Sequence, residues 1–410
     1  MSQHDYNIAN AGGAAVRSDI NNALAAVQSL NSGSTEPTAT KPFMPWYDTT
    51  TGALKMRNAA DTEWISMAEA AGGLSLRNKI INGNMGIAQR GTAAVTTNVY
   101  GPADRWKNDS VGSTFSTTQG SFVSGDTLYD TGGAQYFTTV AVTSVAGASN
   151  YVKIGQPIED VRILAGQTVT VSFWAKAASG TPSIGFEVWQ SFGTGGSPSA
   201  AVTGVGQSQA LTTTWTKYTK TFTVASISGK TIGTTANTSF TVLDIWLDSG
   251  SSSATRSGSI GQASKTVSIA QVQVEIGSVS TPFEFRPIGM ELALAQRYYY
   301  KQFPGVASYK FCIGAVLSTT NGVGIMHFPA QMRIIPALEQ TGTANQYQVN
   351  QFVSAITCSA IPIVNAQYVS VNYGGIQFAV ASGLTVGSAA ALQTDATNGA
   401  TAFIAWNAEL

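Results

Sequence analysis

The stretch 167-QTVTVSFWAKA-177 alternates apolar and polar side chains along its whole length. Successive side chains of a β-strand point to opposite faces, so this alternation is typical of a strand with one buried face. The predicted buried face carries Val169, Val171, Phe173 and Ala175, and the opposite face carries Thr170, Ser172, Trp174 and Lys176. The stretch therefore predicts a strand in a layered β domain.

The same alternation recurs in 184-IGFEVWQSF-192, 215-WTKYTKTFTV-224, 240-FTVLDIWLDSG-250 and 266-TVSIAQVQVEI-276. Loops rich in Gly, Ser and Thr separate these runs, which favours two antiparallel sheets packed face to face. We predict a jelly-roll-like β-sandwich over residues 77–286. A connector helix in 289-GMELALAQRYY-299 and later strand-like runs predict a smaller C-terminal β-sandwich within residues 287–410. The predicted fold class is mainly β.

The clearest helical pattern lies near the N-terminus, in 14-AAVRSDINNALAAVQSL-30. Its apolar residues follow a heptad spacing: Val16, Ile20, Ala23, Val27 and Leu30. Two heptads are too short to be stable alone in water, so this stripe is expected to pack against something. It either lies on its own domain or joins a short bundle of identical helices around a symmetry axis. Residues 1–33 are therefore predicted to anchor the chain, and residues 34–76 to form a small β-module with a linker.

Composition argues against several classes of function. The 22 basic and 22 acidic side chains cancel, so no summed positive field exists for nucleic acid or anionic lipid heads. The sequence has no basic and apolar leader and no apolar run long enough to span a bilayer. We expect no nucleic-acid partner, no membrane insertion and no cofactor.

Cysteine and histidine are scarce. Cys312 and Cys358 are too few for a disulfide framework, and each is expected to be a small buried hydrophobe, with a single bridge between them as the alternative. The two histidines, His4 and His327, lie far apart and in different predicted modules. This is a poor supply for a catalytic triad, and the sequence contains no zinc spacing or phosphate-binding loop. We therefore assign no catalytic residues and no metal site.

Charged residues make up only 11% of the chain, yet several occur in 78-NKIINGNMGIAQRGT-92 and the following 103-ADRW-106. We predict that Arg90, Asp104 and Arg105 form an ion-pair cluster that fixes the start of the sandwich against its sheet. The alternative is a set of solvated charges, each contributing under about 1 kcal/mol.

Several segments in this order resemble one group of proteins. The stretches 21-NNALAAVQSLNSGSTEP-37 and 47-YDTTTGALKMRNAADTEW-64 are similar to the amino-terminal modules of bacteriophage tail fibres and related virion appendages. The carboxy-terminal region of that group is similar to the segments at 78–92, 103–106, 171–177, 271–300 and 327–336. The resemblance implies a homotrimeric fibre, fixed to the virion at its amino-terminal end, that presents β-sandwich domains to a host surface. The group shares no universal catalytic or ligand residues, so the resemblance assigns none.

Three tryptophans fall on the polar sides of their strands by alternation, together with three acidic residues. The glycan-binding candidates are Trp174, Trp189, Trp246, Glu187, Asp244 and Asp248. Sugar rings stack their C–H faces on indole, while their hydroxyls bond to carboxylates at the edge. Three such strands in one sheet would make a saccharide platform. Alternatively, these tryptophans pack under loops or against a neighbouring subunit.

Glycoside hydrolysis would need two carboxylates about 5 to 10 Å apart. Asp244 and Asp248 are four residues apart on one strand, or about 13 Å at ~3.3 Å per residue, which is too far for a pair. Glu187 on a neighbouring strand is the one partner that the sequence offers. We expect binding and no enzymatic activity.

The predicted function is that of a phage tail fibre structural protein, located in the virion and assembled in the host cytoplasm. It would attach through its N-terminus to other tail proteins and contribute to host-surface glycan attachment. One alternative is a purely structural head fibre or tail-fibre adaptor that binds no glycan. Another is a free polysaccharide-binding or polysaccharide-degrading protein, for which the N-terminal anchor would have no purpose.

Overall fold

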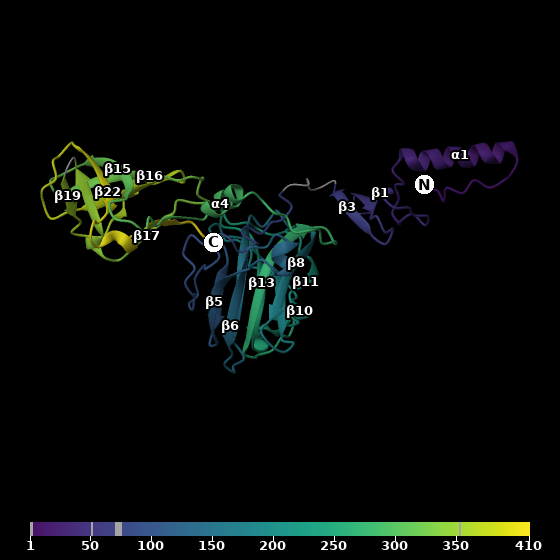
Figure 1. Cartoon of the computed structure of the whole chain (residues 1–410), viewed down its shortest axis with the longest axis horizontal. Helices are drawn as coiled ribbons and strands as arrows, with labels where there is room; N and C mark the ends of the chain where they lie inside the picture. The colour runs from purple at the N-terminus through teal and green to yellow at the C-terminus, as the bar shows by residue number, and fades with distance from the viewer. Residues whose placement is uncertain (1–2, 51, 70–75, 352–353) are drawn as a thin grey trace.

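The computed structural model describes residues 3–50, 52–69, 76–351 and 354–410. Figure 1 shows three lobes: a helix with a small sheet at the N-terminal end, a central β lobe, and a C-terminal β lobe at the opposite end of the long axis. Strands dominate the two larger lobes. The predicted mainly β fold class is confirmed. No helix in the described ranges is long and apolar enough to cross a membrane.

The N-terminal lobe begins with the predicted helix, α1 (Gly13–Gln28). The helix ends before Leu30 and Asn31, which take positive φ values of 55° and 52°. The left-handed conformation that closes the helix therefore falls on these two residues. Three short strands, β1 (Pro45–Asp48), β2 (Ala53–Arg57) and β3 (Trp64–Glu69), form an antiparallel sheet in sequence order. Residues 70–75 of the predicted linker lie outside the described residues.

The central lobe contains two five-stranded antiparallel sheets. Sheet I has the order β10-β9-β12-β7-β4, and sheet II has the order β11-β8-β13-β6-β5. The strands of sheet I are β4 (Lys107–Val111), β7 (Tyr151–Glu159), β9 (Ser183–Ser191), β10 (Gln207–Ala210) and β12 (Phe240–Ser249). The strands of sheet II are β5 (Thr114–Ser121), β6 (Tyr136–Thr143), β8 (Thr168–Ala177), β11 (Thr216–Thr223) and β13 (Lys265–Ile276). Short helical segments α2 (Thr127–Asp130), η1 (Ser251–Ser253) and α3 (Ala254–Ser257) lie in the connections.

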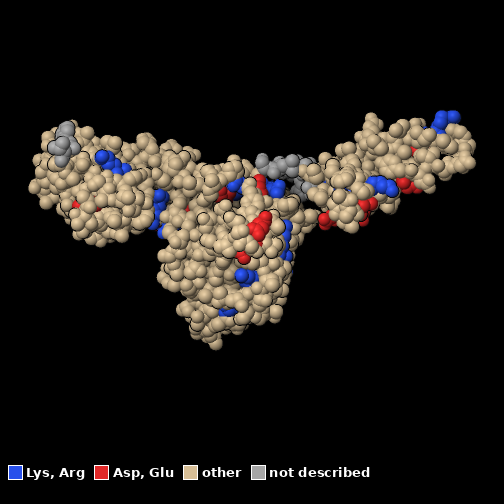
Figure 2. All heavy atoms as spheres, viewed as in Figure 1, with Lys and Arg blue, Asp and Glu red and all other residues tan. Residues whose placement is uncertain are grey.

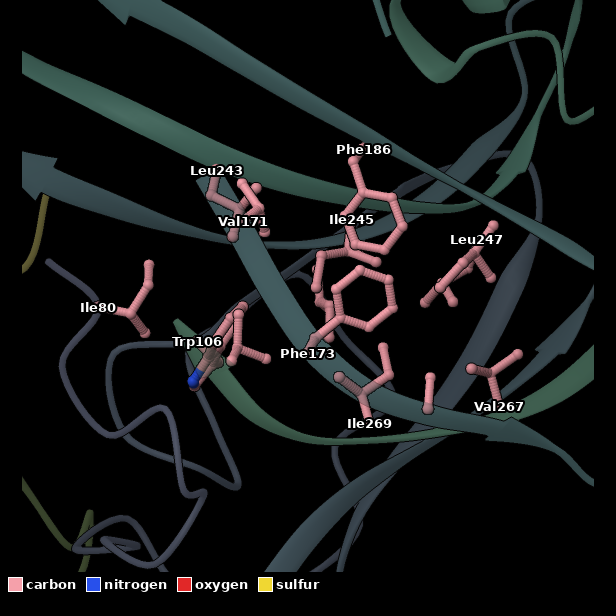
Figure 3. Packing of buried hydrophobic residues seen from close by; sticks show 14 of the residues in the cluster. Ile80, Trp106, Val171, Phe173, Phe186, Leu243, Ile245, Leu247, Val267 and Ile269 are labelled. Atoms are coloured by element: carbon pink, nitrogen blue, oxygen red, sulfur yellow. The ribbon is translucent and has the colours of Figure 1, made fainter. Parts of the chain in front are cut away.

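The apolar faces of the two sheets enclose one core (Figure 3). The inward face predicted for β8 is fully buried, and Phe173 stacks on Phe186 of sheet I with ring centroids 4.3 Å apart. Leu243, Ile245 and Leu247 of β12 also point into this core. The alternation thus identified the core-facing side of β8 and β12 correctly, because every second side chain points the same way. In β13 a register irregularity between Ala270 and Gln273 interrupts the alternation.

The segment that precedes the sandwich packs into the same core. Ile80 and Trp106 are buried there beside the strand residues (Figure 3). A Cβ at Gly83 would lie 2.1 Å from the carbonyl oxygen of Val272 in β13, so only glycine allows this close approach. The Asn82 amide donates to the carbonyls of Ile87 and Asp104 at 2.8 and 3.0 Å. Side-chain amides thereby hold this irregular segment in place.

The C-terminal lobe follows the predicted connector helix, α4 (Ile288–Gln296). A three-stranded sheet has the order β14-β23-β17, with β14 (Tyr299–Gln302), β17 (Ala337–Gln340) and β23 (Ile404–Asn407). A seven-stranded sheet has the order β19-β18-β22-β15-β16-β21-β20. Its strands are β15 (Lys310–Val316), β16 (Asn321–His327), β18 (Tyr347–Gln351), β19 (Ser354–Thr357), β20 (Ile363–Val364), β21 (Tyr373–Ala379) and β22 (Ala389–Thr394). Short turns η2 (Ala344–Gln346), η3 (Ala366–Tyr368) and η4 (Gly399–Thr401) complete it.

This lobe has its own core, to which Tyr347, Phe378 and Trp406 contribute. Cys312 and Cys358 are buried there as free thiols, so the alternative of a bridge between them is not realised. Burial raises the pKa of each thiol to about 12. Both cysteines therefore pack as small apolar side chains.

Candidate functional site

The outer face of sheet I carries a groove of about 170 Å³, which we call the sheet I groove. Side chains from the adjacent strands β4, β7, β12 and β9 line it, because alternate residues of each strand point away from the core. Among the lining residues are Tyr100, Lys153, Gly155, Trp189, Phe240 and Asp244. Its volume is below the roughly 300 to 1,000 Å³ of pockets for drug-sized ligands, which suits a short saccharide segment.

Asp244 supplies the acidic group of this groove. Its Oδ2 accepts hydrogen bonds from Lys153 Nζ and Trp189 Nε1, each at 2.8 Å. Within the described part of the chain, Oδ1 of Asp244 accepts no hydrogen bond, and Asp244 lines the groove although the residue is only 4% exposed. Gly155 lies directly opposite on β7, and a Cβ there would be 2.2 Å from this Oδ1. The absence of a side chain at Gly155 therefore leaves the oxygen room beside the groove.

Trp189 supplies the aromatic surface. Its half-buried ring meets Phe240 edge-on at 5.8 Å between centroids, and the Arg256 guanidinium lies 5.8 Å from its ring. Together with the bond from its N–H to Asp244, these contacts fix the indole orientation. A fixed ring beside a reachable carboxylate oxygen can stack on a sugar and accept a hydroxyl proton.

Trp246 and Glu187, two further candidates from the sequence, lie on the same outer face but are covered. Arg256 of α3 donates to Glu187 at 2.8 Å, and Trp246 Nε1 donates to the same carboxylate at 3.3 Å. Both side chains are almost fully buried. Burial raises the pKa of Glu187, while Arg256 opposes this shift. Covered in this way, these two residues do not line the groove and are out of reach of a ligand.

The two remaining candidates lie elsewhere. Asp248 is fully buried and accepts hydrogen bonds from Ser113, Ser144 and the Ala263 backbone at 2.8 to 3.0 Å, so it ties loops together. Trp174 lies on β8 in sheet II. The expectation of three tryptophans on one sheet is therefore wrong, because alternation assigns a face of a strand but not the sheet to which the strand belongs.

Asp244 and Glu187 are register partners on β12 and β9. Directly opposite residues have Cβ atoms about 5 Å apart, so the strand pairing brings together the two carboxylates that a glycosidase would need. Each carboxylate is already paired with a cation, Lys153 or Arg256. Because Glu187 is sealed from the groove, the arrangement favours binding over hydrolysis.

Residues 113–239 match the family model described as a carbohydrate binding domain. The match runs from β5 to the loop before β12 and includes Trp189. The central lobe is a carbohydrate-binding-like β-sandwich.

Solved structures with a similar fold cover about half of this chain. A CBM4 structure is 15% identical over 48% of this chain and 98% of its own, with a TM-score of 0.27. The family 11 carbohydrate-binding module of Clostridium thermocellum, in complex with a β-1,3-1,4-mixed-linked tetrasaccharide, is 12% identical over 47% and 99%, with a TM-score of 0.28. The enzymatically active domain of tailspike protein 4 of bacteriophage CBA120 is 14% identical over 49% of this chain and 22% of its own, with a TM-score of 0.27. At such low identities and TM-scores, these likenesses say nothing about what this chain binds. No curated protein sequence matches the chain.

The structure brings together the charged residues that precede the carbohydrate-binding-like sandwich. Arg90 Nη1 lies 3.6 Å from Asp104 Oδ1 and 3.4 Å from Glu409 Oε1, and Arg105 also pairs with Glu409. Glu409 was not foreseen, because nothing in the sequence indicates that the end of the chain returns to this point. Burial raises the pKa of Asp104 to about 6, although Arg90 acts in the opposite direction.

Two consecutive tyrosines complete this cluster. The Arg105 guanidinium lies 3.5 Å from the ring centroid of Tyr298, and that of Arg90 lies 3.5 Å from Tyr299. Cations over aromatic faces are stabilised when they are removed from water. The cluster therefore joins the start of the sandwich to the segment that follows α4 and to the end of the chain.

The heptad stripe of α1 divides between two faces of the helix. Val16 and Ala23 are half-buried and share their face with Ala26, which is fully buried, and with Asp19, which bonds to His4 at 2.8 Å. The neighbouring face is exposed: Ile20 by 43%, Leu24 by 61% and Val27 by 58%. Leu30, which follows the helix, is also exposed, by 41%. The helix thus packs one face against the rest of the chain and leaves a neighbouring apolar strip open.

Proposed function

We propose that this chain is a subunit of a phage tail appendage that contributes to host-surface attachment by binding glycan in the sheet I groove. The observation that carries the proposal is the fixed Trp189 ring beside the reachable Oδ1 of Asp244, in a sandwich that matches the carbohydrate binding domain family. Aromatic faces and a few oriented polar groups are the elements with which proteins bind sugars. Neutral hydroxyls suit this groove, because Lys153 already neutralises Asp244.

The test is calorimetric titration of the full chain with polysaccharides from bacterial envelopes. Trp189→Ala should weaken binding at least about tenfold, since stacking and apolar burial together are worth roughly 1.5 to 3 kcal/mol. Asp244→Asn keeps the shape of the groove and should weaken binding by a smaller factor. Tyr368→Ala, which removes an aromatic side chain 43% exposed on the C-terminal lobe, is the matched control. Unchanged affinity in Trp189→Ala, with intact folding, would refute glycan binding at this groove.

We further propose that the chain forms a homotrimer through α1 and attaches through its N-terminal lobe to other tail proteins of the virion, after assembly in the host cytoplasm. The open apolar strip of α1 supports this, because such a strip is stabilised by packing against other helices. Light scattering should give a mass near 128 kDa, three times the 42.7 kDa of one chain. A mass of one chain at micromolar concentration would contradict the trimer.

A purely structural head fibre or tail-fibre adaptor is the second candidate function, favoured by the extent to which Trp246 and Glu187 are covered. Removal of residues 1–75 tests whether the chain is attached to the virion or is a free polysaccharide-binding or polysaccharide-degrading protein. Under our proposal, the truncated chain keeps glycan binding and is no longer incorporated into particles. Normal incorporation of the truncated chain would contradict an N-terminal anchor.

A further inference from the structure

The outer face of sheet II carries a second aromatic depression, of about 550 Å³, which we call the sheet II dish. Its lining includes Trp174 and Lys176 of β8, Trp215 just before β11, and Asp126 and Leu128 at α2. Figure 1 labels the strands of sheet II on the central lobe. In the same view, Figure 2 shows that the Lys, Arg, Asp and Glu atoms of this lobe are scattered among other residues. This face is opposite the sheet I groove.

Phe122 and Phe137 hold the Trp215 ring in place. Their ring centroids lie 5.0 and 5.4 Å from that of Trp215, and the cluster continues to Trp174. Two half-buried indoles are thus supported from below while they line an open depression. Rings that are fixed before binding lose little conformational entropy when a ligand stacks on them.

The hydrogen-bonding groups of the dish distinguish it from the sheet I groove. Among the described residues, the indole N–H groups of Trp174 and Trp215 donate to no protein acceptor, and neither group is enclosed. By contrast, Trp189 gives its N–H to Asp244. Lys176 Nζ lies 5.2 Å from the Trp215 ring and forms no ion pair or hydrogen bond within the described ranges. The dish therefore offers one free cation and two free donors.

The acidic groups near the dish do not take up its free hydrogen-bond donors. Asp126 Oδ2 accepts the backbone N–H of Val123 at 2.9 Å, and Asp130 Oδ2 accepts that of Gly125 at 3.1 Å. Each carboxylate is held by its own loop and keeps its charge, but within the described residues neither forms an ion pair with Lys176. A ligand for the dish must supply acceptors, and a negative charge is the best match to the unpaired Lys176 ammonium.

We propose that the sheet II dish is a second saccharide site, which takes a sugar carrying a carboxylate, such as a uronic acid residue. The sugar ring stacks on the indoles of Trp174 and Trp215, and its carboxylate pairs with Lys176. This inference deepens the proposed glycan-binding function, but it uses residues that the sheet I groove does not contain. The chain would then have a saccharide site on each face of the same sandwich.

The test compares tetragalacturonate with its fully methyl-esterified form, which is neutral, by calorimetry on the full chain. The native chain should bind the acid about tenfold more tightly than the ester, because a hydrogen bond between two charged groups is stronger than one to a neutral group. Lys176→Gln should remove this preference without loss of packing. Lys230→Gln, at an exposed lysine in a loop of the same sandwich, is the matched control and should keep the preference.

Two outcomes would overturn the proposal: an unchanged acid preference in Lys176→Gln, or no binding of tetragalacturonate by the native chain. Trp215→Phe, which keeps the aromatic packing but removes the N–H, should weaken binding of the acid several-fold, and unchanged affinity would argue against a direct contact. Trp189→Ala should leave binding of the acid at the dish intact. If Lys176→Gln kept the acid preference while Trp189→Ala lost binding of other glycans, only the second site would be refuted. The sheet I groove would then stand as a glycan-binding site.

Discussion

Replacement of Asp104 by asparagine should stabilise the central lobe near pH 7.5 and have little effect near pH 4. The Asp104 side chain is fully buried, and its Oδ2 accepts hydrogen bonds from the Gln89 backbone and side chain at 3.2 and 2.8 Å. Asparagine can keep both bonds through its own oxygen. It removes the negative charge, whose burial is only partly offset by Arg90 at 3.6 Å.

The magnitude follows from the shift in pKa. The folded-state pKa of Asp104 is about 6, against 3.8 for an unperturbed aspartate. The native state therefore keeps its proton up to about pH 6, while the unfolded state loses it near pH 4. Stability from this group is fully present below about pH 4 and is lost as pH rises through about 6. At about 1.36 kcal/mol per unit, the loss is about 3 kcal/mol, and asparagine avoids it.

The free energy of unfolding of the sandwich is measured by urea unfolding of the full chain at pH 4.5 and pH 7.5. The readout is hydrogen exchange of peptides in β8. The gap between Asp104→Asn and the native chain should grow by about 2 kcal/mol between these two pH values, because about 1 kcal/mol of the loss has already occurred at pH 4.5. Asp104→Ala is the control, because it loses both Gln89 bonds and should be less stable than asparagine by about 1 to 3 kcal/mol at each pH. An equal gap at both pH values would refute the reasoning.

Three other predictions concern separate parts of the chain. Gly155→Val should weaken glycan binding roughly tenfold or more in calorimetry, because even its Cβ would lie 2.2 Å from Asp244 Oδ1, and an unchanged Kd would count against the groove. The thiols of Cys312 and Cys358 should react with a chromogenic disulfide at pH 8 only after unfolding, because burial raises both pKa values to about 12. Rapid reaction of the native chain would contradict this expectation. Leu24→Glu should reduce the mass in light scattering to that of one chain and keep the helix content measured by circular dichroism, because an unpaired charge inside a helix interface costs several kcal/mol. An unchanged oligomer mass would place the interface elsewhere.

Most of the fold could be predicted from local patterns. The inward face of β8, with Val171 and Phe173, follows from strict alternation, and α1 follows from its heptad spacing. The end of that helix was less accurate, because Leu30 and Asn31 adopt the left-handed conformation ahead of Gly33. Contacts of the following residues decide such an ending, and a local pattern does not record them.

The candidate sites could be predicted only in part. Alternation placed Trp189 and Asp244 on an outward face, and the structure brings them within 2.8 Å of each other. It could not foresee that Arg256 covers Trp246, since Arg256 reaches that face only through the loop that contains α3. The pairing of Arg105 with Glu409, separated by 304 residues, has no sequence signal at all.

The sequence by itself determined which residues form strands, which side of each strand is apolar, and where the amphipathic helix lies. These properties are local, because the repeat of a strand or helix is set by the geometry of a few consecutive residues. Only the tertiary structure decided that Trp174 and Trp189 lie on opposite sheets and that Asp244 lines the sheet I groove while Glu187 does not. The reason is that sheet membership and coverage depend on contacts between segments far apart in the chain, and any one strand sequence is compatible with several such arrangements.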